Sequence, residues 1–480
     1  MSSIDPLLAI EESEELLDFQ LADSILLWPL IRNRLLSRAR FEIEGINNPW
    51  PAVRPPAPGR LVRYVAQALH STMPVSFPCD RPITVFTSSG ACVQVAGDYW
   101  NRLADPLANC FPQSTLVLER ATRFEVLRPR AYAPLRVSDG LFLPALIRGR
   151  LANPSLADQR VVRGLLAVVR GALGHTLRDE RAWHALERYA LRMAAAAPLY
   201  RFMFRRLFRE LRSQLVLIQG SCYGGALALL TYTARESGAR VAEYQHGLIS
   251  RQHQAYNFGP AIAGSAYADY LPDDFLYYGR FWSTVARNPC RPVVLGNPWL
   301  SLEIDRLRRG DRIGPRTILI TSSSHDPAAL IRFVTSLVEG APGRRIVLRP
   351  HPAEADVAQQ RYGSLASRGV ELDRAPLYDS LADADCVVGE ISTTLFEALS
   401  FGIPVFCLAG GATAHHNVEG ALVEVSDPAE ILGALQGCGP APPRHSAEYW
   451  ASSWDENYRT YVRGILHSHT SSVPSVEARL

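Results

Sequence analysis

The chain has 480 residues, of which 47% are hydrophobic and 20% charged, a composition typical of a globular protein of two or three domains. Its formal net charge of +3 is too small to indicate a nucleic-acid partner. All 50 residues counted as lysine or arginine are arginines, which excludes a Schiff-base lysine and a lysine-bearing phosphate loop.

The cysteines and the apolar segments bear on cellular location. None of the eight cysteines has a zinc-type spacing, and several lie in apolar runs, so we expect small buried residues in a reducing cytosol. No apolar run reaches the ~18 residues that span a bilayer, and the acidic start lacks a signal-peptide pattern. Residues 199–212 are basic and amphipathic. They suit either peripheral contact with the inner face of the cytoplasmic membrane or, as we prefer, a helix whose apolar stripe faces the core.

The N-terminal half begins irregularly and then settles into a βαβ pattern. In chain order we predict a helix over 12–40 that Pro29 kinks or divides, a loop over 48–59, strands over 82–87 and 115–119, and a mostly helical insertion near 141–212. From residue 213 the predicted elements are a strand over 215–218, a glycine-rich turn, an alanine-rich helix to 237, and strands over 240–244, 275–278 and 292–295.

The segment 316–440 alternates strand and helix with greater regularity. Predicted strands cover 317–321, 345–348, 385–388 and 403–408, and predicted helices follow Asp326-Pro327 and cover 392–401 and 427–437. Such alternation predicts a parallel sheet covered on both faces.

Two such regions predict an α/β protein with two Rossmann-like domains that face each other across a ligand-binding cleft. The predicted parts are an N-terminal domain over 1–290, a C-terminal domain over 291–440, a linker and final helix over 441–467 that packs back on the N-terminal domain, and a disordered tail over 468–480.

The tetrapeptide Arg349-Pro350-His351-Pro352 directly follows the strand predicted over 345–348, so its side chains stand at the ligand-binding edge of the sheet. Arginine and a protonated histidine are suited to bind a diphosphate or a phosphate leaving group. The prolines fix the loop and so aim the histidine. The alternative is a rigid turn with an incidental basic face, and the motif described next favours binding.

That second motif is Ser392-Thr393-Thr394-Leu395-Phe396-Glu397, which opens a helix directly after a strand. Hydroxyls and the first N–H groups of a helix form an anion site, and three hydroxyl residues are more than N-capping requires. Glu397 shares a helix face with Thr393 and Thr394, where a carboxylate can accept both hydroxyls of a ribose. Considered alone, it would be better interpreted as an exposed helix charge.

Two further features of this domain concern phosphates and metals. Ser323 and Ser324 follow its first strand and are predicted to touch the phosphates. His415-His416 suggests a metal site, but no third ligand stands at a useful spacing, so we predict a loop pair. Because no strand-linked acidic pair of the DxD type is evident, we expect a metal-independent enzyme without a cofactor.

Gln245-His246-Gly247 ends a predicted strand of the other domain, where Gln245 and Gly247 flank a histidine with room for a ligand beside it. A histidine titrates near neutral pH, so His246 is a candidate general base toward an acceptor hydroxyl. Glu243 is the weaker candidate. The alternative is a structural histidine that bonds a neighbouring loop.

Small residues near other strand ends complete the candidates. Gly224, in the glycine-rich turn, either lets a ligand approach the backbone or allows close packing. Ser89 follows the strand over 82–87 and is predicted to line the cleft. The apolar residues of Trp28-Pro29-Leu30-Ile31-Arg32 are explained well by core packing.

Together the two motifs of the second domain resemble the C-terminal domain of GT-B glycosyltransferases, in which a glutamate such as Glu397 binds the ribose. The pairing of Arg-Pro-His-Pro with Ser-Thr is similar to bacterial enzymes with CMP- or CDP-linked donors: capsule sialyl- and polysialyltransferases, Kdo transferases and teichoic-acid glycerophosphotransferases. This resemblance implies that His351, Ser392 and Thr393 bind the nucleotide phosphate. The segment 243–256 also resembles a run in bacterial surface-carbohydrate transferases.

The resemblance implies a metal-independent transferase that moves Kdo, a sialic-acid-like sugar or a polyol phosphate to a growing bacterial capsule, lipopolysaccharide or related surface glycan. Its partners would be a nucleotide-sugar donor and a glycan or lipid-linked glycan acceptor. Three alternatives stay open: a UDP- or GDP-sugar transferase of the same fold, a nucleotide-sugar 2-epimerase-like enzyme, and a non-catalytic binding protein of a polysaccharide pathway. The epimerase would need a cluster of carboxylates in the cleft, and the sequence shows no clear one.

Overall fold

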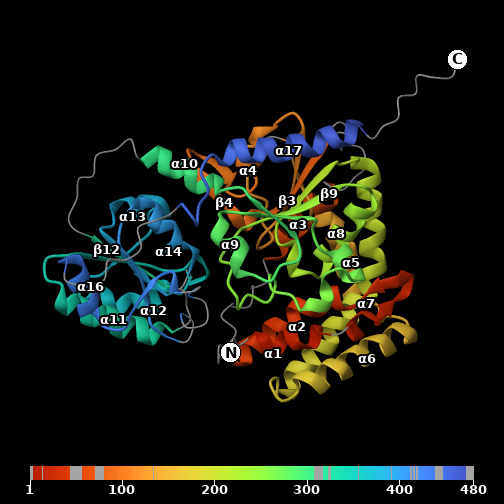
Figure 1. The fold of residues 1–480 in the computed structure, drawn as a ribbon, viewed down its shortest axis with the longest axis horizontal. Helices are drawn as coiled ribbons and strands as arrows, with labels where there is room; N and C mark the ends of the chain where they lie inside the picture. The colour runs from red at the N-terminus through yellow and green to blue at the C-terminus, as the bar shows by residue number, and fades with distance from the viewer. Residues whose placement is uncertain are drawn as a thin grey trace.

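The computed structural model describes residues 4–12, 14–43, 57–70, 81–132, 134–307, 317–322, 326–354, 356–390, 392–410, 413, 417, 420–437 and 447–471. They form two domains, each built on a sheet of parallel strands (Figure 1). The first sheet has seven strands in the order β11-β10-β9-β8-β3-β6-β7, and the second has six in the order β14-β13-β12-β15-β16-β17. The predicted fold class, two Rossmann-like domains, is thereby confirmed.

The seven-stranded sheet forms the centre of the N-terminal domain. In sheet order its strands are β11 (Arg291–Val294), β10 (Asp274–Tyr277), β9 (Arg240–Tyr244), β8 (Leu215–Ile218), β3 (Ile83–Ser88), β6 (Thr115–Arg120) and β7 (Leu135–Val137). One face packs against α4 (Asp105–Cys110) and α17 (Trp454–Ser471), and the other against α7 (Glu180–Leu211) and α8 (Ala226–Glu236). Both faces are apolar because helices cover both.

The predicted helical insertion is present as α5 (Asp139–Leu151), α6 (Leu156–Leu173) and α7. On α7, Tyr200, Phe204 and Leu207 are buried. The apolar stripe of the basic segment 199–212 therefore faces the core, as preferred above. None of the described helices is long and apolar enough to cross a membrane.

The start of the chain differs from the prediction. Helix α2 (Trp28–Ile43) begins only at Trp28, and Pro29 stands in its first turn, where a missing N–H costs no hydrogen bond. Before it lie α1 (Asp5–Leu8), short 3-10 turns and a small hairpin of β1 (Gln20–Leu21) and β2 (Ile25–Leu26). Most of the loop predicted over 48–59 lies outside the described residues, and α3 (Pro58–His70) follows.

Two domain boundaries also differ from the prediction. β11 pairs in parallel with β10, so residues 291–294 belong to the N-terminal sheet and not to the second domain. At the other end α17 runs to Ser471, so the first four residues of the predicted tail are helical, and residues 472–480 lie outside the described part. A hairpin of β4 (Cys92–Val95) and β5 (Asp98–Asn101) was not predicted.

The C-terminal domain follows helix α10 (Pro298–Leu307). Its strands, in sheet order, are β14 (Glu371–Leu372), β13 (Arg345–Arg349), β12 (Thr317–Thr321), β15 (Cys386–Gly389), β16 (Val405–Leu408) and β17 (Val423–Val425). One face packs on α11 (Pro327–Gly340), α12 (Ala358–Ala366) and α16 (Pro428–Leu435), the other on α13 (Leu377–Asp383) and α14 (Thr393–Ala398). Asp326 caps α11 as predicted, accepting a hydrogen bond from the Ala329 N–H at 2.9 Å.

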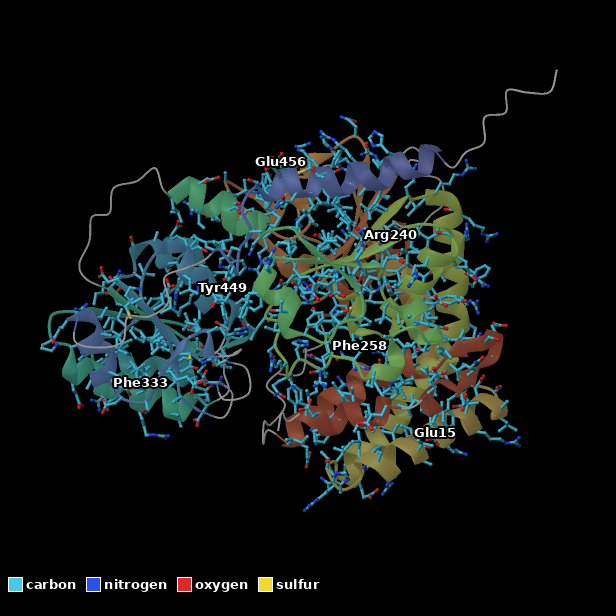
Figure 2. The ribbon with its side chains drawn as sticks, viewed as in Figure 1. Glu15, Arg240, Phe258, Phe333, Tyr449 and Glu456 are labelled. Atoms are coloured by element: carbon cyan, nitrogen blue, oxygen red, sulfur yellow. The ribbon has the colours of Figure 1, made fainter. Side chains whose placement is uncertain are left out.

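An aromatic joint connects the two domains. It consists of Phe281 and Trp282 on α9 (Arg280–Val285), Phe396 on α14, and Tyr449 and Trp450 before α17; Figure 2 labels Tyr449. The rings of Trp282 and Phe396 are 4.9 Å apart, and the Trp450 indole donates to the Phe396 carbonyl at 2.9 Å. Because Phe396 directly precedes Glu397, the joint fixes the helix that carries this carboxylate.

The glycine-rich turn serves close packing, one of its two predicted roles. Gly224 has φ +71°, and a Cβ there would lie 2.5 Å from the carbonyl oxygen of Pro29. The next N–H, of Gly225, donates to the same oxygen at 3.1 Å. Helix α2 can therefore begin against this turn only if residue 224 has no side chain.

Gly224→Ala should lower the free energy of unfolding by about 1–3 kcal/mol, because the backbone angle and the Pro29 carbonyl both exclude a Cβ. The control is Gly171→Ala on α6, where nothing lies within 4 Å and alanine should stabilise by about 0.5–1 kcal/mol. Urea unfolding followed by circular dichroism measures both. An unchanged midpoint for Gly224→Ala would contradict the packing role.

Candidate functional site

Each sheet has one point at which its strand order reverses. In the N-terminal sheet this point lies between β3 and β8, and in the C-terminal sheet between β12 and β15. Open parallel sheets bind ligands beyond the carboxyl ends of the strands at such a point. The residues that follow these strand ends are therefore the first candidates for a site.

A cavity of about 470 Å³ lies at the reversal point of the N-terminal sheet, a volume in the range of ligand pockets. Its walls come from the ends of β3, β6 and β8 and from the segment after β9. The polar side chains that line it belong to Thr87, Ser88, Arg120, Thr122, Arg123, Ser138, Gln219, Tyr223 and His246. Hydroxyls beside arginines suit a hydroxylated ligand that carries negative charge.

His246, the predicted base, lies in this wall beside a buried carboxylate and a buried phenol. Its Nδ1 is 3.4 Å from the hydroxyl oxygen of Tyr256 and 3.8 Å from Oε1 of Glu243. The Tyr256 hydroxyl donates to the same Glu243 oxygen at 3.2 Å. The tyrosine thus connects the carboxylate to the imidazole, whose orientation is fixed by these contacts.

Burial determines the protonation states of His246 and Glu243. It lowers the pKa of His246 to about 4, helped by the positive charge of Arg102, so the imidazole is neutral at pH 7 and able to accept a proton. Burial also raises the pKa of Glu243 to about 7. Glu243 has no exposed surface and accepts a hydrogen bond from the Cys222 N–H at 2.6 Å. It therefore orients His246 from behind and does not line the cavity.

The other predicted residues of this edge have structural contacts. Gln245 is buried and accepts from the Tyr278 N–H at 2.9 Å, which ties the end of β9 to β10. Ser89 is also buried, and its hydroxyl accepts from the Thr122 N–H at 2.7 Å; its neighbour Ser88 lines the cavity instead. Gly247 borders open space, because apart from its chain neighbours no atom lies within 4 Å of the position that a Cβ would take.

At the reversal point of the C-terminal sheet, three buried side-chain oxygens have no hydrogen-bond partner among the described residues. They are Oγ1 of Thr321, Oγ of Ser392 and Oε2 of Glu397. Buried polar atoms are rarely left without a partner because the loss of water costs free energy. Three such atoms together indicate a place where ligand hydroxyls or phosphate oxygens are expected.

Glu397 is only 5% exposed, which rules out the interpretation as an exposed helix charge. Burial raises its pKa to about 6, while Arg102 and a hydrogen bond with Tyr378 lower it. Thr393 and Thr394 are half-buried in the first turn of the same helix. The structure therefore brings together the hydroxyls and the carboxylate that the sequence motif placed on one helix face.

The Arg349–Pro352 loop is held differently from what its motif suggested. Nη1 of Arg349 donates to Oδ2 of Asp373 at 2.6 Å and to the Ala375 carbonyl at 2.8 Å. Its charge is thus compensated within the domain. His351 is half-buried, and its N–H donates to the Ser322 hydroxyl at 3.0 Å.

Sequence reasoning missed Glu354, the residue that holds this loop. Glu354 is 2% exposed and accepts hydrogen bonds from Ser322 and, at 2.7 Å, from the Tyr362 hydroxyl. The Pro-x-Glu spacing after the histidine was the available signal. Ser323, Ser324, His415 and His416 lie outside the described residues. Among the described residues there is no group of three or more His, Cys, Asp or Glu side chains that could hold a metal.

The two edges face each other. Arg123, which lines the cavity of the N-terminal domain, has its Nη1 3.9 Å from Oδ2 of Asp356, just after the His351 loop of the C-terminal domain. Both side chains are exposed, so the contact marks proximity and contributes little stability. The rim of the cavity with His246 therefore lies beside the loop that follows His351.

No protein-family model and no curated protein matches the chain. Among solved structures, the UDP-GlcNAc 2-epimerase from Methanocaldococcus jannaschii is 10% identical with a TM-score of 0.42, over 80% of this chain and 99% of its own. The UDP-GlcNAc 2-epimerase from Neisseria meningitidis bound to UDP-GlcNAc is 11% identical with a TM-score of 0.45, over 80% and 99%. The glycosyltransferase of kitacinnamycin is 14% identical with a TM-score of 0.42, over 81% and 98%. Similarity at this level assigns no activity.

The low pKa of His246 makes stability depend on pH. The unfolded histidine has a pKa near 6.5 and the folded one about 4, so acid stabilises the unfolded state between these values. Relative to His246→Gln, the wild type should lose up to about 3 kcal/mol of unfolding free energy between pH 7.5 and pH 4. Urea unfolding at several pH values measures this, and a pH-independent difference between the two proteins would contradict the buried neutral imidazole.

Proposed function

We propose that this protein is a GT-B glycosyltransferase that binds a nucleotide-sugar donor on its C-terminal domain and an acceptor hydroxyl in its N-terminal cavity. The observation that carries the proposal is the pairing of two sheet edges across one cleft. One edge presents a neutral histidine in a cavity, and the other presents buried oxygens without partners beside a buried carboxylate. A base facing a nucleotide-type edge is what sugar transfer requires.

On the donor side, the polar side chains at the end of the C-terminal sheet suit different parts of a nucleotide. The Glu397 carboxylate has a free oxygen that can accept a hydrogen bond from a ribose hydroxyl. Ser392 and Thr393 present hydroxyls at the first turn of α14, where phosphate oxygens can accept them. His351, which follows β13 two strands away from β15, donates to the leaving phosphate in this proposal.

On the acceptor side, His246 accepts the proton of the attacking hydroxyl. The acceptor oxygen then forms a bond to the anomeric carbon of the donor sugar, and the bond between that carbon and the phosphate oxygen breaks. The nucleotide phosphate leaves with the electron pair. Tyr256 and Glu243 hold the imidazole during this step. The imidazole becomes positively charged when it takes the proton, and the Glu243 carboxylate, whose pKa is about 7, stabilises that charge when it is ionised.

The resemblance of the two C-terminal motifs favours a CMP- or CDP-linked donor and a bacterial surface glycan as acceptor, with UDP- or GDP-linked donors as the alternative. An epimerase would require carboxylates gathered around the sugar. Among the described residues that line the N-terminal cavity there is no aspartate or glutamate, and the buried Glu243 and Glu397 belong to different domains. A transferase therefore fits the described residues better.

Nucleotide binding is tested by a thermal-shift screen with CMP, CDP, UDP and GDP. A nucleotide at 100 times its Kd stabilises the folded state by about 2.7 kcal/mol, so an upward shift of the melting temperature is expected with the cytidine nucleotides. No shift with any of the four would contradict the transferase. A shift with UDP or GDP alone would contradict only the cytidine donor.

His246→Ala should reduce the rate of sugar transfer by roughly 10²–10⁴-fold, because the general base is lost, while the nucleotide-induced thermal shift is retained. The control is His184→Ala on the exposed side of α7. Transfer is measured with purified donor and with acceptor glycan, and nucleotide release with donor alone. Equal rates for His246→Ala and the wild type would assign His246 a structural role.

A further inference from the structure

Arg102 lies in the loop directly after β5. Its backbone N–H donates to the Ala91 carbonyl at 3.2 Å, and its side chain is half-buried. Its neighbour Trp100 lies 6.3 Å, ring to ring, from Trp299 on α10, the helix that leads to the C-terminal domain. This loop is therefore part of the wall where the two domains meet.

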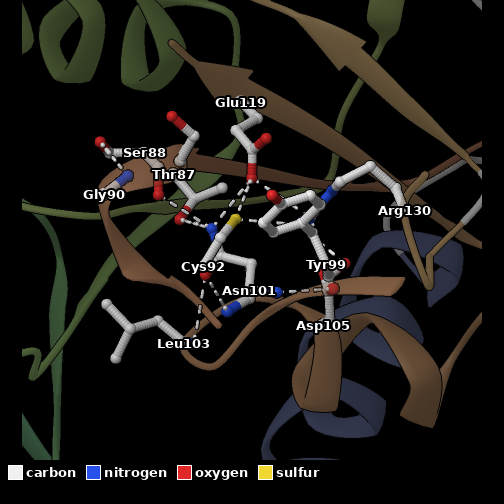
Figure 3. A network of polar contacts seen from close by, with 12 residues as sticks. Thr87, Ser88, Gly90, Cys92, Tyr99, Asn101, Leu103, Asp105, Glu119 and Arg130 are labelled. Carbon is white, nitrogen blue, oxygen red and sulfur yellow. Dashed lines mark hydrogen bonds and ion pairs between the residues drawn. The ribbon is translucent and has the colours of Figure 1, made fainter. Parts of the chain in front are cut away.

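A buried polar network fixes the loop (Figure 3). At its centre the Asn101 side chain donates to the Thr87 hydroxyl at 3.1 Å and to the Ser88 carbonyl at 2.9 Å, the end of β3 that lines the cavity. The same side chain accepts from the N–H groups of Leu103 at 3.2 Å and Ala104 at 3.1 Å. The backbone that follows Arg102 is thus bound to the side chain of the residue before it, and this amide ties the turn to the end of β3, where Ser88 lines the cavity.

Behind Asn101 lies a second layer of buried charge. Asp105 accepts from the Asn101 N–H at 2.8 Å, and Arg130 contacts both Asp105, at 3.1 Å, and Glu119, at 3.2 Å. These side chains are 4% exposed or less. These bonds hold the hairpin, although Nε of Arg130 is a buried atom without a hydrogen-bond partner among the described residues.

The network uses Arg130 for its own charge balance and includes no bond to the Arg102 side chain among the described residues. Among the described residues, none forms a hydrogen bond or ion pair with the Arg102 guanidinium. Its charge nevertheless acts on groups of both domains: burial is the main cause of the shifted pKa values of His246 and Glu397, and Arg102 lowers both. It acts likewise on Tyr278 and Tyr378, one in each domain.

We propose that Arg102 binds the phosphate that links nucleotide and sugar in the donor, between the acceptor base and the ribose-binding glutamate. The inference rests on the proposed function, which places a phosphate between His246 and Glu397. A guanidinium held half-buried without an anion is suited to bidentate contact with phosphate oxygens. As the bond to the anomeric carbon breaks, the phosphate gains negative charge, and Arg102 neutralises it.

Arg102 is proposed to contact only the phosphate. Its contribution to binding can therefore be measured by comparing a nucleotide with the nucleoside that lacks the phosphate. By titration calorimetry, Arg102→Ala should weaken the binding of CMP and CDP roughly 10- to 100-fold and leave the binding of cytidine unchanged. Arg102→Lys, which keeps the charge but not the planar fork, should show a smaller loss. Arg181→Ala, at the exposed start of α7, removes one charge elsewhere and should bind all three as the wild type does.

A second measurement checks the place of the arginine without any ligand. Loss of its positive charge should raise the pKa of His246 in Arg102→Ala but not in the control Arg181→Ala. NMR titration of the imidazole measures this pKa in both variants. Equal weakening of cytidine and CMP, or an unchanged CMP affinity whatever the His246 pKa, would overturn this inference and leave the proposed function standing. If the wild type binds UDP or GDP instead, the same comparison is made with uridine or guanosine and its nucleotide. Failure of the wild type to bind any of CMP, CDP, UDP and GDP would overturn both proposals.

Discussion

The buried ion pair between Arg32 and Glu11 is the interaction on which the acceptor side of the molecule depends. The two side chains are 1% and 0% exposed. Taking both charges out of water costs several kcal/mol, which their attraction offsets only if the remaining donors and acceptors are also bonded. Nη2 of Arg32 meets Oε2 of Glu11 at 2.9 Å, and its guanidinium also donates to the carbonyls of Gln254 at 2.7 Å and Asn257 at 2.6 Å.

These contacts are linked to His246, the candidate base, through the loop after β9 and through Tyr256. Glu11 also accepts from the indole of Trp28 at 2.7 Å and from the Gly259 N–H at 2.9 Å, so the chain start, α2 and the loop after β9 are held at one point. Tyr256 lies in this loop, one residue before Asn257, and its hydroxyl contacts His246. The orientation of the imidazole is therefore determined by residues more than 200 positions away in the sequence, and not by its own strand alone.

The sequence identified the parts of the site that follow from periodicity. Strands 83–88, 215–218 and 386–389 are apolar runs with glycine or serine at or just after their ends, and their carboxyl ends lie where the alternation of strands and helices placed them. What it could not predict were pairings between distant polar residues. The sequence suggested an Arg349 side chain available for a ligand, because nothing nearby in the sequence marks its ion-pair partner. That partner, Asp373, stands 24 residues later on a neighbouring strand end. The Asn101 network was hidden for the same reason, since β4 and β5 have no clear apolar alternation.

The titratable groups of the cleft owe their pKa values mainly to burial and not to fixed ion pairs. Desolvation is the largest cause of the shifts at His246, Glu243 and Glu397, and it moves each toward its neutral form. Neutral groups can remain buried without a counter-charge and still exchange a proton when a ligand brings charge into the cleft. The two charged networks, around Arg32 and around Arg130, lie behind these groups and fix their backbone. The molecule thus separates networks of paired charge from the groups that would meet a ligand.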